Sequence, residues 1–269
     1  MSAHIGKTIG VLLAAAVAVA AGLSLLSGCA GGGEEKQAVV YEDMKASFDQ
    51  AGLLSSNIGI FTKTVSGDAV SYGECGSGVI IEKRDGDYYA LTAAHVVGAE
   101  NATLLVFTVN TEMKTDDIPG YEDLNLLSQE TYESMVTAEV VFVSSRDDLA
   151  VIRFASDEDL AVAELADADP AKGDRILCVG NPQNDWFAVS YGNVTSGIER
   201  FGETQDHPSN AMRHSAYIQV GSSGGAAFGE DMKLAGVTPG ASLSPDGKTF
   251  YYGVLIPVSE IRQCLAEWK

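Results

Sequence analysis

A short segment of glycine and serine, Gly221-Ser222-Ser223-Gly224-Gly225, is the strongest candidate for chemistry in this sequence. A serine hydroxyl is a weak nucleophile unless a base accepts its proton, and the charge that develops on an attacked carbonyl oxygen needs preorganised donors. Glycine on both sides lets the backbone bend so that two amide groups point at one place while the side chain stays clear. The segment predicts that Ser223 attacks a carbonyl carbon and that the N–H groups of Gly221 and Ser223 form an oxyanion hole. The alternative is an ordinary turn.

A histidine and a pair of acids supply the other groups that a nucleophilic serine needs. His95 ends the run Thr92-Ala-Ala-His95, and Asp147 and Asp148 stand directly before the apolar residues 149–152. Taken alone, such a histidine is more often structural, and such an acid more often forms a turn. Histidine, aspartate and serine in this chain order form one of the known catalytic triads. The order at positions 95, 148 and 223 therefore favours catalysis.

Most of the elements that must hold these groups are predicted to be short β-strands. The chain between residues 57 and 258 consists of runs of strand length that are rich in β-branched or aromatic residues and are separated by Gly, Asn and Asp. These runs occupy residues 78–82, 88–92, 104–109, 138–143, 149–154, 176–179, 187–191, 217–220, 234–237 and 251–256. Their spacing predicts an all-β sandwich or a pair of barrels. Residues 41–54 predict a short helix, and the apolar spacing in residues 259–269 predicts a C-terminal helix.

The first segment of the chain predicts export. Lys7 precedes an apolar stretch over residues 9–26, which ends at Leu26-Ser-Gly-Cys29. A positive start, an apolar core and small residues before a cleavage point are the parts of an export signal. The ending resembles the lipobox of bacterial lipoproteins, which implies removal of residues 1–28 and lipid attachment to Cys29. Residues 29–40 are then expected to be a flexible tether on the outer face of the cell membrane. The alternative is a transmembrane anchor.

Composition excludes several classes of protein. The chain has 269 residues, of which 17 are Lys or Arg and 37 are Asp or Glu, so its formal charge is −20. Such a charge repels phosphate backbones, which argues against a nucleic-acid partner. A hydrophobic content of 46% with 20% charged residues excludes a disordered chain. No CxxC spacing is present, and we predict neither a metal nor a cofactor.

Five ordered motifs resemble those of one family, the trypsin-like serine peptidases of the chymotrypsin fold. The similarity is greater to the bacterial members and to the HtrA (DegP) protease domain than to digestive enzymes. The motifs are Gly76-Ser-Gly-Val-Ile-Ile81, Thr92-Ala-Ala-His95, Asp148-Leu-Ala-Val-Ile152, Gly180-Asn-Pro182 and Gly221-Ser-Ser-Gly-Gly225. This resemblance implies two six-stranded antiparallel β-barrels with a C-terminal helix. The barrels would occupy residues 41–269 and divide near residues 155–172.

The resemblance also implies an activity and the residues that carry it. Ser223 would be the nucleophile of a serine endopeptidase that cleaves polypeptides through an acyl-enzyme. His95 would be the general base and then the general acid, and Asp148 would orient its ring. Asp147 is the rival acid, but the family places the acid directly before Leu-Ala, which selects Asp148. The alternative is a protease-like binding or chaperone module with little turnover.

Substrate contacts are implied in the same way. Residues 237–240 resemble the edge along which a substrate strand pairs, and Thr238 corresponds to a family serine near the triad aspartate. The specificity pocket would be walled by Ser215, Ala216 and Tyr217, by Pro239 and Gly240, and by Gly253. We find no clear acid at its base, so a preference for arginine or lysine is not expected.

Several positions depart from the family pattern. Ser222 replaces the aspartate that pairs with a new N-terminus in digestive enzymes, which excludes that mode of activation. Val96 stands where a disulfide partner of Cys75 would be expected. The run before Ser223 is shorter than in HtrA proteins and more similar to glutamyl endopeptidases. HtrA proteins continue into a PDZ domain, which we do not expect here, and the oligomeric state stays open. The acidic residues 111–135 predict a surface loop, with Ca²⁺ binding as the weaker alternative.

Overall fold

We analysed a computed structural model of the chain. It describes residues 34–73, 75–99, 101–115, 127–182, 185–201 and 210–269, and the side chains from residue 41 onward. The predicted export signal, Cys29 and residues 116–126 of the predicted acidic loop lie outside the described residues. Within the described ranges, no helix is long and apolar enough to cross a membrane.

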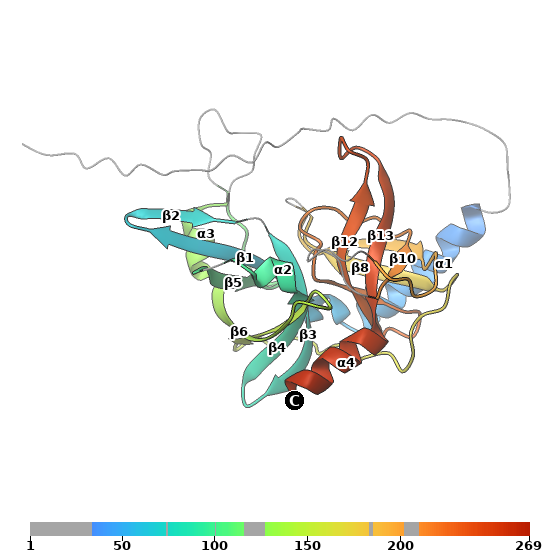
Figure 1. Cartoon of the computed structure of the whole chain (residues 1–269), viewed down its shortest axis with the longest axis horizontal. Coiled ribbons are helices and arrows are strands. Elements are labelled where there is room, and N and C mark those ends of the chain that lie inside the picture. Colours follow the sequence, from blue (N-terminus) through green and yellow to red (C-terminus); the bar gives the residue numbers. More distant parts are fainter. Residues whose placement is uncertain (1–33, 74, 100, 116–126, 183–184, 202–209) are drawn as a thin grey trace, which may run out of the picture.

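The first sheet contains seven antiparallel strands, six of which close into a barrel. The strand order is β2-β1-β3-β4-β7-β6-β5, and β1 also pairs with β5, which closes the ring. The additional strand β2 extends the hairpin at one side of the barrel (Figure 1). The strands are β1 (Asn57–Ser66), β2 (Ala69–Tyr72), β3 (Gly76–Arg84), β4 (Asp87–Ala93), β5 (Thr103–Phe107), β6 (Val136–Ser144) and β7 (Leu149–Ala155).

The second sheet contains six antiparallel strands in the order β10-β13-β12-β11-β8-β9. A bridge between Val194 and His214 joins the edges next to β9 and β10, so this sheet also curls into a barrel. The strands are β8 (Arg175–Gly180), β9 (Ala188–Asn193), β10 (Met212–His214), β11 (Gly225–Phe228), β12 (Leu234–Leu243) and β13 (Phe250–Pro257). The prediction of an all-β fold with two six-stranded barrels is therefore confirmed, with β2 as an extra strand.

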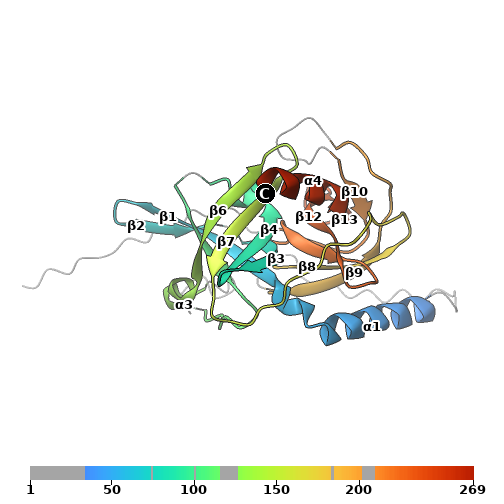
Figure 2. The same cartoon turned by 90° about the horizontal axis from the view of Figure 1, so that it is seen from below.

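The helices cover the barrels rather than build them. They are α1 (Glu34–Gln50), the 3-10 turn η1 (Leu53–Ser56), α2 (Ala94–Val97), α3 (Gln129–Ser134) and α4 (Val258–Trp268). Helix α4 confirms the predicted C-terminal helix and buries Ile261 and Cys264. It runs along the junction of the two barrels (Figure 2). Its Trp268 packs against Tyr89 of β4 at 5.4 Å between ring centroids.

Helix α1 begins earlier than the sequence analysis expected. Residues 34–40 were assigned to a flexible tether, but they form the first part of this helix, because the glycine run ends at Gly33 and good helix formers follow it. Met44 and Phe48 are buried, and the Phe48 ring lies 5.5 Å from that of Phe228 in β11. Helix α1 is thus attached to the second barrel (Figure 2).

One hydrophobic cluster spans the junction of the two barrels, in addition to a cluster inside each barrel. Val79 and Leu91 of the first barrel belong to the same buried cluster as Val179 and Val237 of the second. Full burial of such a side chain contributes roughly 1.5–3 kcal/mol, so this cluster holds the barrels together as one body. The chain passes from β7 of the first barrel to β8 of the second through residues 156–174. The catalytic motifs lie along this junction.

One predicted strand is absent. Residues 217–220 form an irregular segment between β10 and β11, in which Ile218 is buried while Tyr217 and Val220 are exposed. The apolar composition of the run predicts a strand, but no strand among the described residues pairs with it. The segment connects the second barrel to Ser223 and forms part of the site.

The described cysteines are all free thiols. Cys75, Cys178 and Cys264 form no disulfide with one another. A β-carbon placed on Gly76 would lie 2.4 Å from the Val96 side chain, so Val96 fills the space beside Cys75. Burial raises the pKa of each thiol, to about 12 for both Cys178 and Cys264.

Candidate active site

His95 and Asp148 form a hydrogen-bonded pair at the junction of the barrels. His95 follows β4 in the short helix α2, and Asp148 directly precedes β7, which pairs with β4. Nδ1 of His95 lies 2.8 Å from Oδ2 of Asp148, and the backbone N–H of His95 donates to Oδ1 at 3.0 Å. A carboxylate only accepts, so Nδ1 carries the proton and Nε2 keeps its lone pair. The Asp148 side chain is 2% exposed, whereas that of His95 is 40% exposed.

The structure distinguishes the two neighbouring acids. The Asp147 carboxylate accepts hydrogen bonds from Arg146 at 2.8 Å and from the Ser144 hydroxyl at 2.7 Å, so it is engaged away from His95. Burial alone would raise the pKa of Asp147, but these bonds hold it below its ordinary value. Asp148 has a φ of 51°, a left-handed conformation that aspartate tolerates better than most residues. The acid that meets the imidazole is therefore Asp148.

The turn that carries Ser223 requires glycine at two positions. Gly221 and Gly224 have φ values of 98° and 86°, in the left-handed region. A β-carbon on Gly221 would lie 2.2 Å from the carbonyl oxygen of Asn181, and one on Gly224 would lie 2.2 Å from the carbonyl oxygen of Ser77. The same β-carbon on Gly224 would lie 2.8 Å from the backbone nitrogen of Ala93. This turn is thus packed against the chain that leads into His95.

Strand β3 of the first barrel holds this turn through Ser77. The Ser77 hydroxyl donates to the carbonyl oxygen of Gly221 at 2.7 Å, and the Ser77 N–H donates to that of Ser223 at 2.8 Å. The Ser77 hydroxyl also accepts from the N–H of Asn181 at 2.9 Å. A buried serine thus fixes the backbone on both sides of Ser222.

The backbone donors of this turn are available for a ligand. In the described ranges, no protein acceptor takes a hydrogen bond from the N–H of Gly221 or of Ser223. The carbonyl groups of both residues are held by Ser77, and Ser223 itself is partly exposed. In the described ranges both donors are therefore without a protein acceptor, which a site for an oxyanion requires.

Thr238 supports the turn that carries Ser223. Its buried hydroxyl lies 3.3 Å from the carbonyl oxygen of Ser222 and 3.2 Å from that of Gly225, and it can donate to either. Its expected position near the triad aspartate stays a prediction. Thr238 is also the last residue of β12 that pairs with β11, so in the described residues the edge from Pro239 to Leu243 has no partner on that side.

Three residues expected in the specificity pocket have other neighbours. Ala216 is fully buried, and the Ser215 hydroxyl accepts from the N–H of Asn193 at 2.9 Å, which helps to close the second barrel. A β-carbon on Gly253 would lie 2.1 Å from the ring of His214. Ser215, Ala216 and Gly253 thus take part in the closure of the second barrel, and their place in a specificity pocket stays a prediction.

His214 is a buried histidine that the sequence analysis left unassigned. Its side chain is inaccessible to solvent, and neither ring nitrogen makes a hydrogen bond of good geometry in the described residues. Burial lowers its pKa to about 4, although the carbonyl groups of Val254 and Ala216 favour the charged form. The ring is therefore neutral at pH 7.

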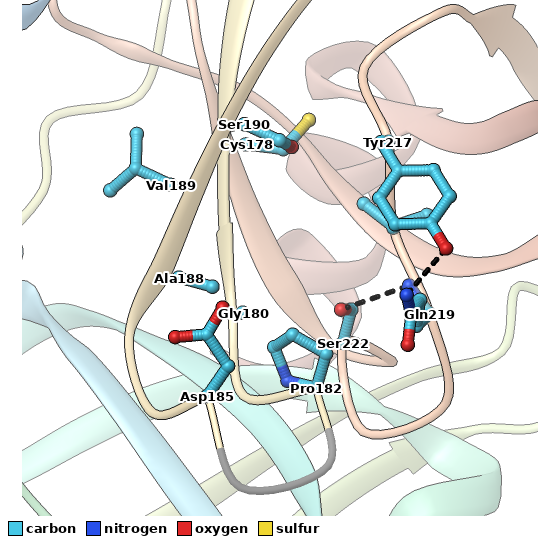
Figure 3. Close-up of a pocket in the computed structure, with 11 residues that line it drawn as sticks. Cys178, Gly180, Pro182, Asp185, Ala188, Val189, Ser190, Tyr217, Gln219 and Ser222 are labelled. Atoms are coloured by element: carbon cyan, nitrogen blue, oxygen red, sulfur yellow. Dashed lines mark hydrogen bonds between the residues drawn. The ribbon is translucent and has the colours of Figure 1, made fainter. Parts of the chain in front are cut away.

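A cavity of about 350 Å³ lies beside the nucleophile turn (Figure 3). Residues of β8, β9 and the loop between them form one wall, and residues 217–222 form the other. Tyr217 is the only residue expected to contact substrate that lines it. The sequence analysis missed the wall from β8 and β9, although the Gly180-Asn-Pro182 motif marked the point where that wall begins. No group of three or more His, Cys, Asp or Glu side chains among the described residues is arranged to hold a metal ion.

Comparison with known proteins agrees with this geometry. A family described as the trypsin-like peptidase domain matches residues 76–237, a range that contains His95, Asp148 and Ser223. The chain is 31% identical over 193 residues to a "Probable serine protease do-like" of Buchnera aphidicola, an alignment that covers 71% of this chain and 35% of the relative. It is 29% identical over 193 residues to the "Periplasmic serine endoprotease DegP" of Salmonella typhimurium, with the same coverage of each chain.

A third relative covers more of the chain. Identity is 26% over 231 residues to the "Serine protease Do-like HtrA" of Lactococcus lactis, which includes 82% of this chain and 50% of the relative. The chain thus spans between about a third and a half of the length of these relatives. With the family match, the two barrels and the hydrogen-bonded histidine and aspartate, the chain belongs to the trypsin-like peptidase family and is similar to its HtrA and DegP members.

Proposed function

We propose that this protein is a serine endopeptidase that hydrolyses polypeptides through an acyl-enzyme at Ser223. The observation that carries the proposal is the His95 and Asp148 pair, which lies next to a glycine turn with two available N–H donors. A nucleophile, a base of fixed tautomer and an oxyanion site are the parts that acyl transfer needs. The related DegP and HtrA proteins are named as serine proteases, which supports the same activity.

The residues perform the reaction in two halves. Oγ of Ser223 attacks the carbonyl carbon of the peptide bond while its proton passes to Nε2 of His95. The N–H groups of Gly221 and Ser223 stabilise the oxyanion, and Asp148 stabilises the imidazolium through Nδ1. The C–N bond then breaks, and His95 returns the proton to the leaving amine. Water cleaves the resulting ester by the same sequence of proton transfers, which restores the Ser223 hydroxyl.

The free edge of β12 supports a polypeptide substrate. An extended peptide can pair with the unpartnered backbone from Pro239 to Leu243, as an added strand pairs with an exposed sheet edge. The substrate contacts proposed here are Pro239, Gly240 and Tyr217, while Thr238 is fully buried and supports the turn that carries Ser223. Main-chain pairing is independent of side chains, so this edge supplies affinity for unfolded segments of varied sequence.

A serine-directed probe tests the proposal. A fluorophosphonate should label the purified protein once per chain, and peptide mapping should assign the label to Ser223. Ser223→Ala should abolish labelling, while Ser215→Ala, at a nearby exposed serine, should leave it intact. A wild-type protein that is folded by circular dichroism and stays unlabelled would overturn the proposal and favour a binding module with this fold.

We further propose that the protein acts outside the cytoplasm, attached through lipid on Cys29. The apolar residues 9–26 and the lipobox-like Leu26-Ser-Gly-Cys29 support this, and one relative is named as periplasmic. In a bacterial host, radiolabelled palmitate should enter the wild-type chain and not the Cys29→Ser variant. Equal incorporation into both would contradict lipid attachment at this residue.

A further inference from the structure

The two N–H groups that we propose as oxyanion donors are held unequally by the rest of the protein. The N–H of Ser223 belongs to the peptide group whose carbonyl is that of Ser222, and this carbonyl accepts from the N–H of Gly225 at 2.9 Å. The N–H of Gly221 belongs to the peptide group of Val220. In the described ranges, no donor bonds to the Val220 carbonyl oxygen. The Gly221 donor therefore depends on bonds made by the next peptide group.

The next peptide group is tied to the first barrel by the buried hydroxyl of Ser77 in β3. This hydroxyl donates to the Gly221 carbonyl oxygen at 2.7 Å. The N–H on the other side of the same peptide group, that of Ser222, donates only to Gln219 in the irregular segment. Glycine has no side chain that limits its backbone, and Gly221 has a φ of 98°, so the bond from Ser77 restricts a residue that is otherwise free to turn.

Asn181 determines the direction in which the Ser77 hydroxyl donates. Its backbone N–H and its side-chain Nδ2 lie 2.9 and 3.1 Å from Oγ of Ser77. A serine hydroxyl has one hydrogen to donate and two lone pairs that accept. Because Asn181 occupies both lone pairs, the hydrogen is left for Gly221, whose carbonyl oxygen can only accept. Oγ of Ser77 thus makes every hydrogen bond of which it is capable.

Asn181 is itself fixed between the two barrels. Its Nδ2 also donates to the carbonyl oxygen of Ile58 in β1 at 3.1 Å, and its Oδ1 accepts from the N–H of Phe187 at 2.9 Å. A carbonyl on one side and an N–H on the other allow only one orientation of the amide. Asn181 directly follows β8 of the second barrel, so its side chain joins that barrel to β1 and β3 of the first.

The backbone of Ser77 extends this network to the strand that leads to His95. Its N–H donates to the carbonyl oxygen of Ser223 at 2.8 Å, and its carbonyl oxygen accepts from the buried Thr92 hydroxyl at 2.7 Å. Thr92 lies in β4, the strand that ends before His95. Ser77 therefore contacts both the turn that carries the proposed nucleophile and the strand that carries the proposed base.

We propose that Ser77 and Asn181 are positioning residues for the oxyanion site, which keep the Gly221 N–H directed at the substrate carbonyl oxygen before attack. Both side chains are 1% exposed, so neither contacts the substrate. The proposal rests on the proposed function. An oriented donor stabilises charge that develops only in the transition state, so the pair should act on kcat rather than on KM. Activity should then require contact between the barrels, since the bond from Ser77 to Gly221 crosses their junction.

Ser77→Ala in the full-length protein tests the proposal, with Ser56→Ala as the matched control. Ser56 is also a buried serine whose hydroxyl donates to a backbone carbonyl at 2.7 Å, but its partner is Leu53. Ser77→Ala should lower kcat for a peptide substrate by roughly 10- to 100-fold, less than the loss on removal of a whole oxyanion donor, and leave KM within about threefold. Ser56→Ala should leave both constants unchanged. Ser77→Cys, with a weak donor of similar size, should have an intermediate kcat.

Each kinetic result decides the positioning role. A kcat of Ser77→Ala within about threefold of wild type, an equal loss in Ser56→Ala, or a change in KM alone would overturn it. If circular dichroism shows that Ser77→Ala is unfolded, an unchanged kcat in Ser77→Cys would overturn it instead. A peptidyl trifluoromethyl ketone forms an adduct with Ser223 that carries an oxyanion. Its inhibition constant should increase in Ser77→Ala by the same factor by which kcat/KM falls, and an unchanged constant would contradict the proposal.

The connection between Ser77 and Asn181 is measured without any activity. In urea unfolding of Ser223→Ala protein, adding Ser77→Ala and Asn181→Ala together should destabilise less than the sum of the two single changes, because both remove the same bonds. Additive losses would overturn the connection. Wild-type protein that hydrolyses no peptide and takes up no fluorophosphonate, while the two losses are still not additive, would refute the proposed function and leave the connection standing.

Discussion

The chain before Ser223 and the chain after it are held in different ways. After Ser223, β11 is buried at every residue and pairs with a strand on each side. Before Ser223, residues 217–220 are irregular, and three of them, Tyr217, Gln219 and Val220, are exposed. Ser223 is thus fixed from its C-terminal side, while the segment that leads to Gly221, the proposed oxyanion donor, depends on a few hydrogen bonds. If the backbone of the site changes conformation, we therefore expect the change in the residues before Ser223.

The largest expected effect is a loss of kcat on substitution of Asp148, whose carboxylate is bonded to His95. Asp148→Asn should lower kcat by about 10⁴-fold, because an amide favours the wrong imidazole tautomer. Asp147→Asn should leave kcat within about tenfold, because its carboxylate is bonded to Arg146 and Ser144. Steady-state hydrolysis of a peptide substrate measures both. Similar losses in the two variants would mean that the acids share the role.

Gly224→Ala tests how tightly the chain directly after Ser223 is packed. The new β-carbon would lie 2.2 Å from the Ser77 carbonyl oxygen at a positive φ, so the free energy of unfolding should fall by about 3 kcal/mol or more. Gly197→Ala is the matched control, because a β-carbon there has no neighbour within 4 Å. Urea unfolding measures both variants. A stable Gly224→Ala protein would show that the turn is less tightly packed than described.

His214 is the last residue of β10, directly before the irregular segment that leads to Ser223. Because its ring is buried, the free energy of unfolding should depend on pH. Its pKa is about 4 in the folded protein and near 6.5 when unfolded, so between these values the unfolded chain binds more protons. The free energy of unfolding should therefore fall as the pH decreases from 6.5 toward 4, by up to roughly 3 kcal/mol. His214→Phe retains His95 and should lose this part of the dependence. Parallel curves for the two proteins would exclude His214 as the cause.

The smallest effect is expected on the loosely held side. Gln219→Ala removes an exposed side chain whose amide donates to the Tyr217 hydroxyl, so the free energy of unfolding should change by less than about 0.5 kcal/mol. Thermal unfolding followed by circular dichroism is sufficient to measure this. A decrease of more than about 1 kcal/mol in the free energy of unfolding would show that the chain before Ser223 is held as firmly as the chain after it.

The residues whose role depends on local chemistry could be predicted from the sequence. The glycines around Ser223 are needed for a positive φ and for close backbone approach, and those requirements are visible in the motif itself. The choice of Asp148 over Asp147 followed from a family resemblance, and the hydrogen bond to His95 agrees with it. The barrels followed from many short apolar runs, because strand length and spacing are properties of the chain.

The residues that depend on tertiary packing could not be predicted. The cavity joins residues 178–190 to residues 217–222, which meet only because β8 and β11 are neighbours in the sheet. The sequence around Ser77 does not indicate that its hydroxyl donates a hydrogen bond to the carbonyl oxygen of Gly221, because that bond depends on the contact between the two barrels. The contact between Thr238 and Ser222 could not be predicted for a similar reason, because it depends on the register of β11 and β12.

The buried thiols have a consequence for the redox behaviour of the protein. With a pKa of about 12, Cys178 and Cys264 are ionised in roughly one molecule in 10⁵ at pH 7, so the nucleophilic thiolate is scarce. Peroxides and disulfide exchange both act on the thiolate. The described fold therefore depends on no disulfide among these cysteines, and its melting temperature should be the same with and without a reductant. Among the described residues, these thiols therefore resist oxidation because they are buried, and no cross-link contributes to the stability of this part of the fold.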